Sequence, residues 1–175
     1  MMPKLKFIAL GVAFLSMASF LKDDNRDFPT MSGTNLNGKD ITLPSDAHGK
    51  FALIGVVRSM KAEQDMVSWI EPVYQSISGN MMFQVKMYFI PMTGGIQGVS
   101  VETLRRKLKE SMDSSLYKYV LLYTGPVQEY VKTLGMKDKD LPYLFVVDPR
   151  GKVTYTESGK YTEQKLENIT DKLAE

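Results

Sequence analysis

Few side chains in this sequence are able to carry out covalent or acid–base chemistry. The 175 residues contain no cysteine and one histidine, His48. Without cysteine there is no thiol nucleophile, no disulfide exchange and no zinc site built on thiolates. A serine hydroxyl needs an activating base, and the histidine is not near Ser59 in the sequence. We therefore expect a protein that is not an enzyme, with no catalytic residue, cofactor or metal site, and with His48 in a solvated loop.

The polar residues best placed for binding follow the most apolar segment of the chain. Residues 51–57 form a continuous apolar run bounded by turn signals, which predicts a central buried strand. Apolar residues then recur at helical spacing from 62 to 77, where Pro72 should kink the predicted helix. The residues that join these two elements include Arg58, Ser59, Met60, Lys61 and Glu63.

The remaining apolar patterns predict an α/β sandwich. The order is strand, helix, strand, helix, strand, helix, hairpin, helix, which is typical of a partly parallel sheet with an antiparallel edge. Further strands are predicted near 41–43, 83–90, 119–123, 143–147 and 153–155, and further helices over 100–112, 127–134 and 162–173. Ser100 or a neighbour is expected to cap the first of these helices, and Thr162 the last.

The overall charge narrows the class of partner. Lys and Arg total 22 and Asp and Glu total 20, which gives a formal net charge of +2. So small a net charge provides no general attraction to nucleic acid or to an anionic membrane. We expect a protein or peptide partner and no nucleic acid.

The N-terminal residues have the pattern of a targeting segment. Two lysines precede an uncharged apolar stretch at residues 7–21, and small residues that suit signal peptidase end at Ala18. The stretch is shorter than the roughly 20 residues of a spanning helix, so cleavage after Ala18 and retention as an anchor both stay open. We expect a signal peptide or anchor at 1–21, a linker at 22–27 and the folded domain at 28–175, with membrane contact only through 7–21 if uncleaved.

Segments across most of the chain resemble a known fold family. Phe28–Pro29, Leu36–Lys39 and Ile41–Leu43 resemble the entry hairpin of membrane-anchored thioredoxins and peroxiredoxins. Leu141–Val153 resembles their proline-then-strand segment and its Asp-x-x-Gly-Lys turn. The resemblance implies a thioredoxin-like three-layer sandwich, in which a central mixed sheet has helices on both faces.

Three segments are more particularly similar to the ATP-synthase assembly factor family numbered ten, a thioredoxin-like family of mitochondria with bacterial relatives. They are Ser68–Pro72, Asp148–Lys152 and Ser158–Glu163, although Tyr155 stands where that family carries tryptophan. Together with the absence of cysteine, this resemblance implies a non-catalytic assembly or accessory factor for a membrane protein complex, whose partner would be a subunit of that complex. With the targeting segment it implies a periplasmic location, the mitochondrial inner membrane being the alternative. A permanent structural subunit and an enzyme with non-thiol chemistry are the other functions left open.

The resembled fold also implies a docking surface. It places residues 58–63 beside Pro142 and Tyr143, with a cis peptide bond at Leu141–Pro142 that presents backbone to an extended ligand. Tyr143 would add an aromatic contact, and Arg58 and Lys61 would favour an acidic segment. In the alternative, Trp69 and Pro142 are ordinary packing residues and the interface lies on a helix face.

The lack of cysteine generates a first prediction. The purified protein should reduce insulin and consume peroxide no faster than a heat-inactivated sample, because it has no thiol to oxidise. Turnover well above that control would contradict the assignment.

Overall fold

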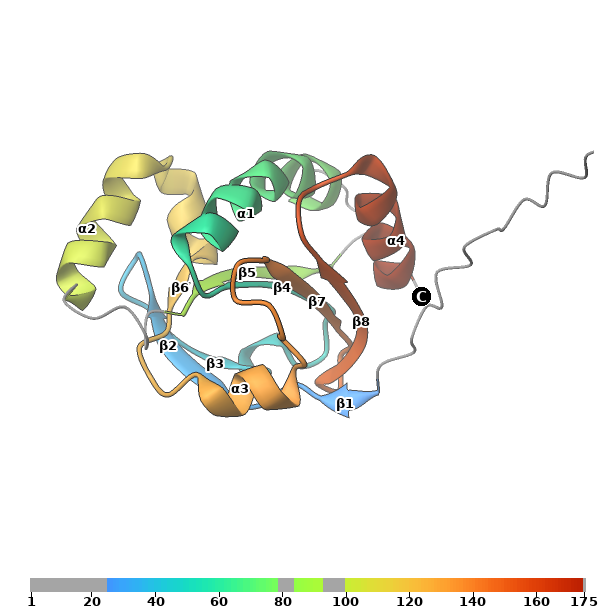
Figure 1. The fold of residues 1–175 in the computed structure, drawn as a ribbon. Helices are drawn as coiled ribbons and strands as arrows, with labels where there is room; N and C mark the ends of the chain where they lie inside the picture. Colours follow the sequence, from blue (N-terminus) through green and yellow to red (C-terminus); the bar gives the residue numbers. More distant parts are fainter. Residues whose placement is uncertain (1–24, 79–83, 93–99, 175) are drawn as a thin grey trace, which may run out of the picture.

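The computed structural model of the chain describes residues 25–78, 84–92 and 100–174. A five-stranded mixed sheet, in the order β1-β8-β7-β4-β5, forms its centre (Figure 1). A smaller three-stranded sheet has the order β3-β2-β6. The strands are β1 (Arg26–Asp27), β2 (Met31–Asn35), β3 (Asp40–Leu43), β4 (Ala52–Val57), β5 (Lys86–Pro91), β6 (Leu121–Leu122), β7 (Tyr143–Val147) and β8 (Lys152–Ser158).

Helices cover both faces of the central sheet. Helices α1 and α4 pack on one face, and α3 packs with the β2–β3 hairpin on the other (Figure 1). This arrangement confirms the three-layer sandwich predicted from the sequence. The helices are α1 (Met60–Val73), α2 (Val101–Ser111), α3 (Gln128–Thr133) and α4 (Glu163–Leu173), with shorter turns η1 (Ser45–Ala47), η2 (Tyr74–Ser78) and η3 (Ser114–Tyr119).

Strand β4 is the predicted central strand, and all of its residues are buried. It pairs in parallel with β5 and antiparallel with β7. Because side chains alternate along a strand, Ile54 and Val56 face one side of the sheet while Leu53 and Val57 face the other. Two hydrophobic clusters therefore form, one on each face of β4.

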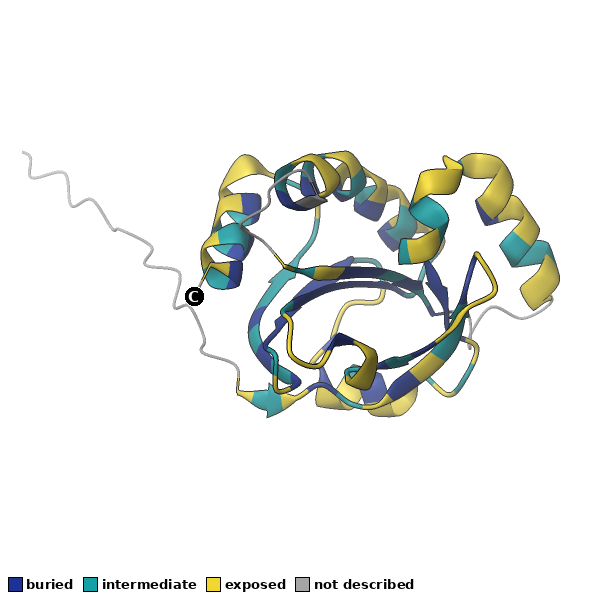
Figure 2. Cartoon of the chain, turned by 180° about the vertical axis from the view of Figure 1, so that it is seen from behind, coloured by how far each residue is buried: buried dark blue, intermediate teal, exposed yellow. Residues whose placement is uncertain are grey.

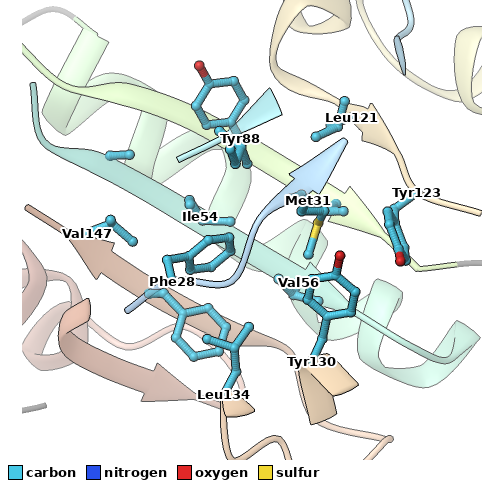
Figure 3. Close-up of a cluster of buried hydrophobic side chains, with 14 of the residues drawn as sticks. Phe28, Met31, Ile54, Val56, Tyr88, Leu121, Tyr123, Tyr130, Leu134 and Val147 are labelled. Carbon is cyan, nitrogen blue, oxygen red and sulfur yellow. The ribbon is translucent and has the colours of Figure 1, made fainter. Parts of the chain in front are cut away.

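The cluster below the sheet joins the hairpin and α3 to β4. Figure 3 shows Phe28 next to Ile54, and Met31 and Tyr130 of α3 next to Val56. The Tyr130 hydroxyl donates a hydrogen bond of 2.7 Å to the carbonyl of Thr30. Tyr130 thereby fixes α3 to the chain that enters β2.

The cluster above the sheet is organised by α1. Trp69 is fully buried, and its indole N–H donates to the carbonyl of Gly159 at 2.9 Å. Its ring also meets Tyr161 edge-on at 5.5 Å. Gly55 lets α1 come close, since a Cβ there would lie 2.9 Å from the Met66 methyl group. The helix is thus held both to β4 and to the connection between β8 and α4.

Side-chain caps begin three of the helices, as the sequence indicates for two of them. The caps satisfy amide groups that lack a partner within the first turn. Ser59 accepts from the amide of Ala62, Ser100 from that of Thr103, and Thr162 from that of Lys165.

Two predicted elements have different limits in the structure. α1 ends at Val73 and continues as the π-helical turn η2, close to Pro72, which has no N–H to donate to the helix. The strand expected at 119–123 is reduced to β6, because η3 extends to Tyr119 and its first turn is capped by Asp113. β6 pairs antiparallel with β2.

Arg26 and Asp27, expected in the linker, form strand β1 instead. This strand pairs with the start of β8, and Asp27 forms an ion pair of 2.8 Å with Lys152. The pairing gives hydrogen-bond partners to backbone groups at the edge of the sheet. The run of charged residues in the sequence gives no indication of this strand. The expected signal or anchor segment at 1–21 lies outside the described residues. In the ranges described, no helix has the length and apolar character needed to cross a membrane.

The turn between β7 and β8 is held by a buried carboxylate. Asp148 accepts hydrogen bonds from the amides of Arg150 and Lys152 at 2.9 and 2.8 Å, and from the Arg150 guanidinium. Burial raises the pKa of Asp148, but these hydrogen bonds and the Arg150 charge outweigh burial and hold it below its usual value. Gly151 allows the turn, with φ of +87°.

We predict that Asp148→Asn destabilises the protein by about 1–3 kcal/mol at neutral pH, because the amide cannot accept all the hydrogen bonds that the carboxylate accepts. A carboxyl whose pKa is lowered in the folded state adds stability above its unfolded pKa and loses it as pH falls through the folded pKa. The difference from wild type should therefore shrink below about pH 4. Urea unfolding across this pH range measures the effect. Asp171→Asn, at an exposed position of α4, is the control and should show no such loss.

Candidate partner-binding site

The predicted site begins where β4 passes into α1. Ser59 caps the helix, its hydroxyl oxygen accepting from the Ala62 amide at 3.1 Å. The amide of Glu63 donates to the Ser59 carbonyl at 3.0 Å. Two of the amides at the helix start are thus used within the helix and are not free for an extended ligand.

Arg58 supports the fold from inside the site. Its guanidinium donates to the carbonyl of Met136 at 2.6 Å, while its buried Nε has no hydrogen-bond partner among the described residues. The contact joins the end of β4 to the loop after α3. The contact directs part of the half-buried Arg58 guanidinium inward, and Lys61 is the exposed cation of this segment.

Asp140 brings the two predicted pieces of the site together. The hydrogen bond with Ser59 is the largest influence on its pKa and lowers it; burial opposes this, and the charges of Lys139 and Lys61 add to the lowering. The Lys139 ammonium lies 3.6 Å from the carboxylate. The start of α1 therefore lies beside the segment leading to Pro142, as the resembled fold implied.

The predicted cis bond at Leu141–Pro142 is wrong. That bond is trans, and the cis peptide bond of the described chain is at Leu43–Pro44. The trans form is the lower-energy state of an X-Pro bond. It leads the chain directly into β7, and the Pro142 carbonyl accepts from the Gly159 amide at 3.0 Å.

Tyr143 is also placed differently from the expectation. Its side chain is 8% exposed and stacks on Phe145 with ring centroids 6.4 Å apart. Its hydroxyl accepts a hydrogen bond of 2.9 Å from the Asp138 amide. Tyr143 and Pro142 are thus packing residues, and an aromatic contact from Tyr143 to a partner is not available on this surface.

The accessible part of the predicted site lies on α1. Met60 is 75% exposed, Lys61 is exposed and Glu63 is half-buried. Met60 and Glu63 contribute to a groove of about 570 Å³ between α1, β5 and the α2–η3 segment. Sequence reasoning missed this groove, although Met60 and Val67 are apolar residues seven positions apart on the side of the helix away from the core.

The described residues offer no evident metal centre. They contain no group of three or more histidine, cysteine, aspartate or glutamate residues able to hold an ion. His48 is exposed, in the loop that follows η1.

The contact between Ser59 and Asp140 generates a prediction. Ser59→Ala should raise the pKa of Asp140, because it removes the main hydrogen bond to the carboxylate, and should cost about 0.5–2 kcal/mol through loss of the helix cap. Carboxyl NMR titration and urea unfolding measure the two effects. Ser100→Ala is a matched control that removes the cap of α2. It should destabilise the protein by a similar amount and leave the pKa of Asp140 unchanged. An unaltered Asp140 titration in Ser59→Ala would contradict the assignment.

The fold is shared with thiol-disulfide oxidoreductases and with Sco proteins. The thioredoxin domain of an oxidoreductase from Bacteroides vulgatus is 18% identical, with a TM-score of 0.63, and the match covers 87% of this chain and 98% of that one. The exposed lipoprotein thioredoxin of Streptococcus pneumoniae is 18% identical with a TM-score of 0.57, over 82% and 99%. Yeast Sco1 is 17% identical with a TM-score of 0.60, over 83% and 92%. These likenesses establish a thioredoxin-like fold.

The sequence itself identifies a narrower group. No curated protein matches it closely enough to count as a relative. The model of the family described as ATP10 protein, however, matches residues 8–174. That match spans every helix and strand of the structure, including the turn held by Asp148 and the connection that receives Trp69. The chain belongs to the ATP10 protein family.

Proposed function

We propose that this protein is a non-catalytic assembly factor for a membrane protein complex, the ATP synthase, and that it acts by binding a protein subunit. The observation that carries the proposal is the match to the ATP10 family over residues 8–174. The Sco neighbours support it, since one of them is described as a member of a family of cytochrome c oxidase assembly proteins.

The start of α1 supports a binding role without thiol chemistry. In the redox-active members of the resembled fold, two cysteines occupy the turn after the first central strand, where helix amides lower the thiol pKa. In this chain Arg58 and Ser59 form the turn, and α1 begins at Met60. The Ser59 hydroxyl oxygen accepts from the Ala62 amide and so caps the helix. No cysteine stands at this turn.

We further propose that the protein works outside the cytoplasm, in the periplasm, with the mitochondrial inner membrane as the alternative. The support is the targeting pattern of the first 21 residues, in which lysines precede an uncharged apolar stretch. Cleavage after Ala18 would release the folded domain. Retention would tether it to the membrane.

Deletion of the gene in its host tests the assembly role. Native gels should show several-fold less assembled ATP synthase, while synthesis of the individual subunits is unchanged, and the wild-type gene should restore the complex. An unchanged amount of complex would contradict the role. A permanent subunit would instead co-migrate with the finished complex, from which an assembly factor should be absent.

Complementation with variants tests the surface at the start of α1. Met60→Glu places a charge on the exposed apolar side chain at the helix start and should lower the yield of complex. Lys132→Glu introduces the same residue at an exposed position of α3, on the opposite face of the sheet, and should restore the complex fully.

A further inference from the structure

An open groove runs along α1 on the side facing α2 and η3. Its volume is about 570 Å³, and its lining is mainly apolar. Figure 2 shows that exposed residues follow the outer sides of α1 and α2, while buried residues face the sheet. The apolar lining includes Met60, Val67, Ile70, Leu108, Met112 and Leu116.

An exposed apolar stripe follows the groove along α1 and continues into η2. Met60 is 75% exposed and Val67 61% exposed, so much of each side chain stands in solvent. They lie two helical turns apart, about 10 Å along the axis. Tyr74, 36% exposed, follows after another two turns. An elongated apolar stripe of this length suits the side of a helix better than it suits a small compact ligand.

The charges in the groove are of one sign. Among its described lining residues are the carboxylates of Glu63 and Glu71, and there is no lysine or arginine. Glu71 accepts a hydrogen bond of 2.9 Å from Gln75. Glu63 is half-buried, burial raises its pKa, and its carboxylate forms no ion pair or hydrogen bond with the residues described. A partly desolvated carboxylate without a partner is stabilised by an approaching cation.

We propose that this groove binds an amphipathic helix of the partner protein, whose apolar side chains pack along Met60 and Val67 and whose lysine or arginine pairs with Glu63. The inference rests on the proposed function only in requiring a protein partner, and it specifies the chemistry of that partner. It also reverses the charge preference predicted from Arg58 and Lys61.

The same charges disfavour two other occupants. A second copy of the chain would bring one acidic groove against another if the two grooves faced each other. An anionic membrane surface would be repelled by Glu63 and Glu71. A cationic amphipathic helix meets both the apolar and the acidic parts of the groove, as helix-in-groove recognition requires.

Three synthetic peptides test the proposal on the full-length protein. Each is a helix of about 15 residues with leucines along one side, and the three differ only in carrying lysine, glutamine or glutamate at one position beside the leucines. Fluorescence anisotropy measures their affinities. The lysine peptide should bind about tenfold more tightly than the glutamate peptide, with the glutamine peptide between them.

Charge reversal and apolar disruption locate the binding. Glu63→Lys should invert the order of the three peptide affinities, whereas Glu167→Lys, at an exposed position of α4, should preserve that order. Val67→Glu should weaken binding of the lysine peptide at least about tenfold. Val101→Glu, at an exposed valine outside the groove lining, should not weaken it. Circular dichroism checks that each variant is folded.

Three results would overturn the proposal. The first is equal affinity for all peptides, or affinity unaffected by both Glu63→Lys and Val67→Glu. The second is a dimer in sedimentation that Val67→Glu dissociates, which would make a second copy the occupant. The third is binding to phosphatidylcholine–phosphatidylglycerol vesicles that Val67→Glu abolishes. None of these results changes the yield of ATP synthase after gene deletion, so failure of the groove and failure of the assembly role are distinguishable.

Discussion

The burial of β4 on both faces is the constraint on which the rest of the molecule depends. Each of its residues is withdrawn from water, so both sides of the strand must be covered. One side receives α1 and α4, and the other receives the β2–β3 hairpin and α3. Since Gly55 has no side chain, α1 approaches the strand closely through Met66. The position of α1, and with it the groove on its outer side, follows from this packing.

The start of α1 combines two interactions that hold it to the chain before β7. Arg58 donates to the Met136 carbonyl, and Ser59 acts on Asp140, whose pKa it lowers. Both use polar groups internally that a binding surface would otherwise offer. The side chains left accessible to a partner are therefore further along the helix, at Met60 and Glu63. For this reason the same stretch of sequence supports two opposite expectations, an acidic partner from Arg58 and Lys61 and a basic partner from Glu63.

Local patterns predicted most elements, because the apolar run of β4 and the caps Ser100 and Thr162 are properties of neighbouring residues. The site was harder to predict because its contacts are distant in sequence; Arg58 and Met136 are 78 positions apart. The expected exposure of Tyr143 was wrong because β7 is covered on both faces, which only the complete fold reveals. The cis bond inferred from resemblance was wrong as well. The seven-residue spacing of Met60 and Val67 was visible in the sequence. The prediction instead followed the apolar residues on the opposite side of the helix, which face the core.

The pairing of β1 with β8 fixes where the chain enters the domain. Strands β1 and β5 are the opposite edges of the central sheet, four strand spacings or about 19 Å apart. The groove is lined by Phe89, Ile90 and Pro91 of β5, so it lies at the far edge from this entry (Figure 1). Under the two proposals, attachment through the residues before β1 would act at one edge of the sheet, and a partner helix in the groove would bind at the opposite edge. Attachment and partner binding would then not compete for the same surface.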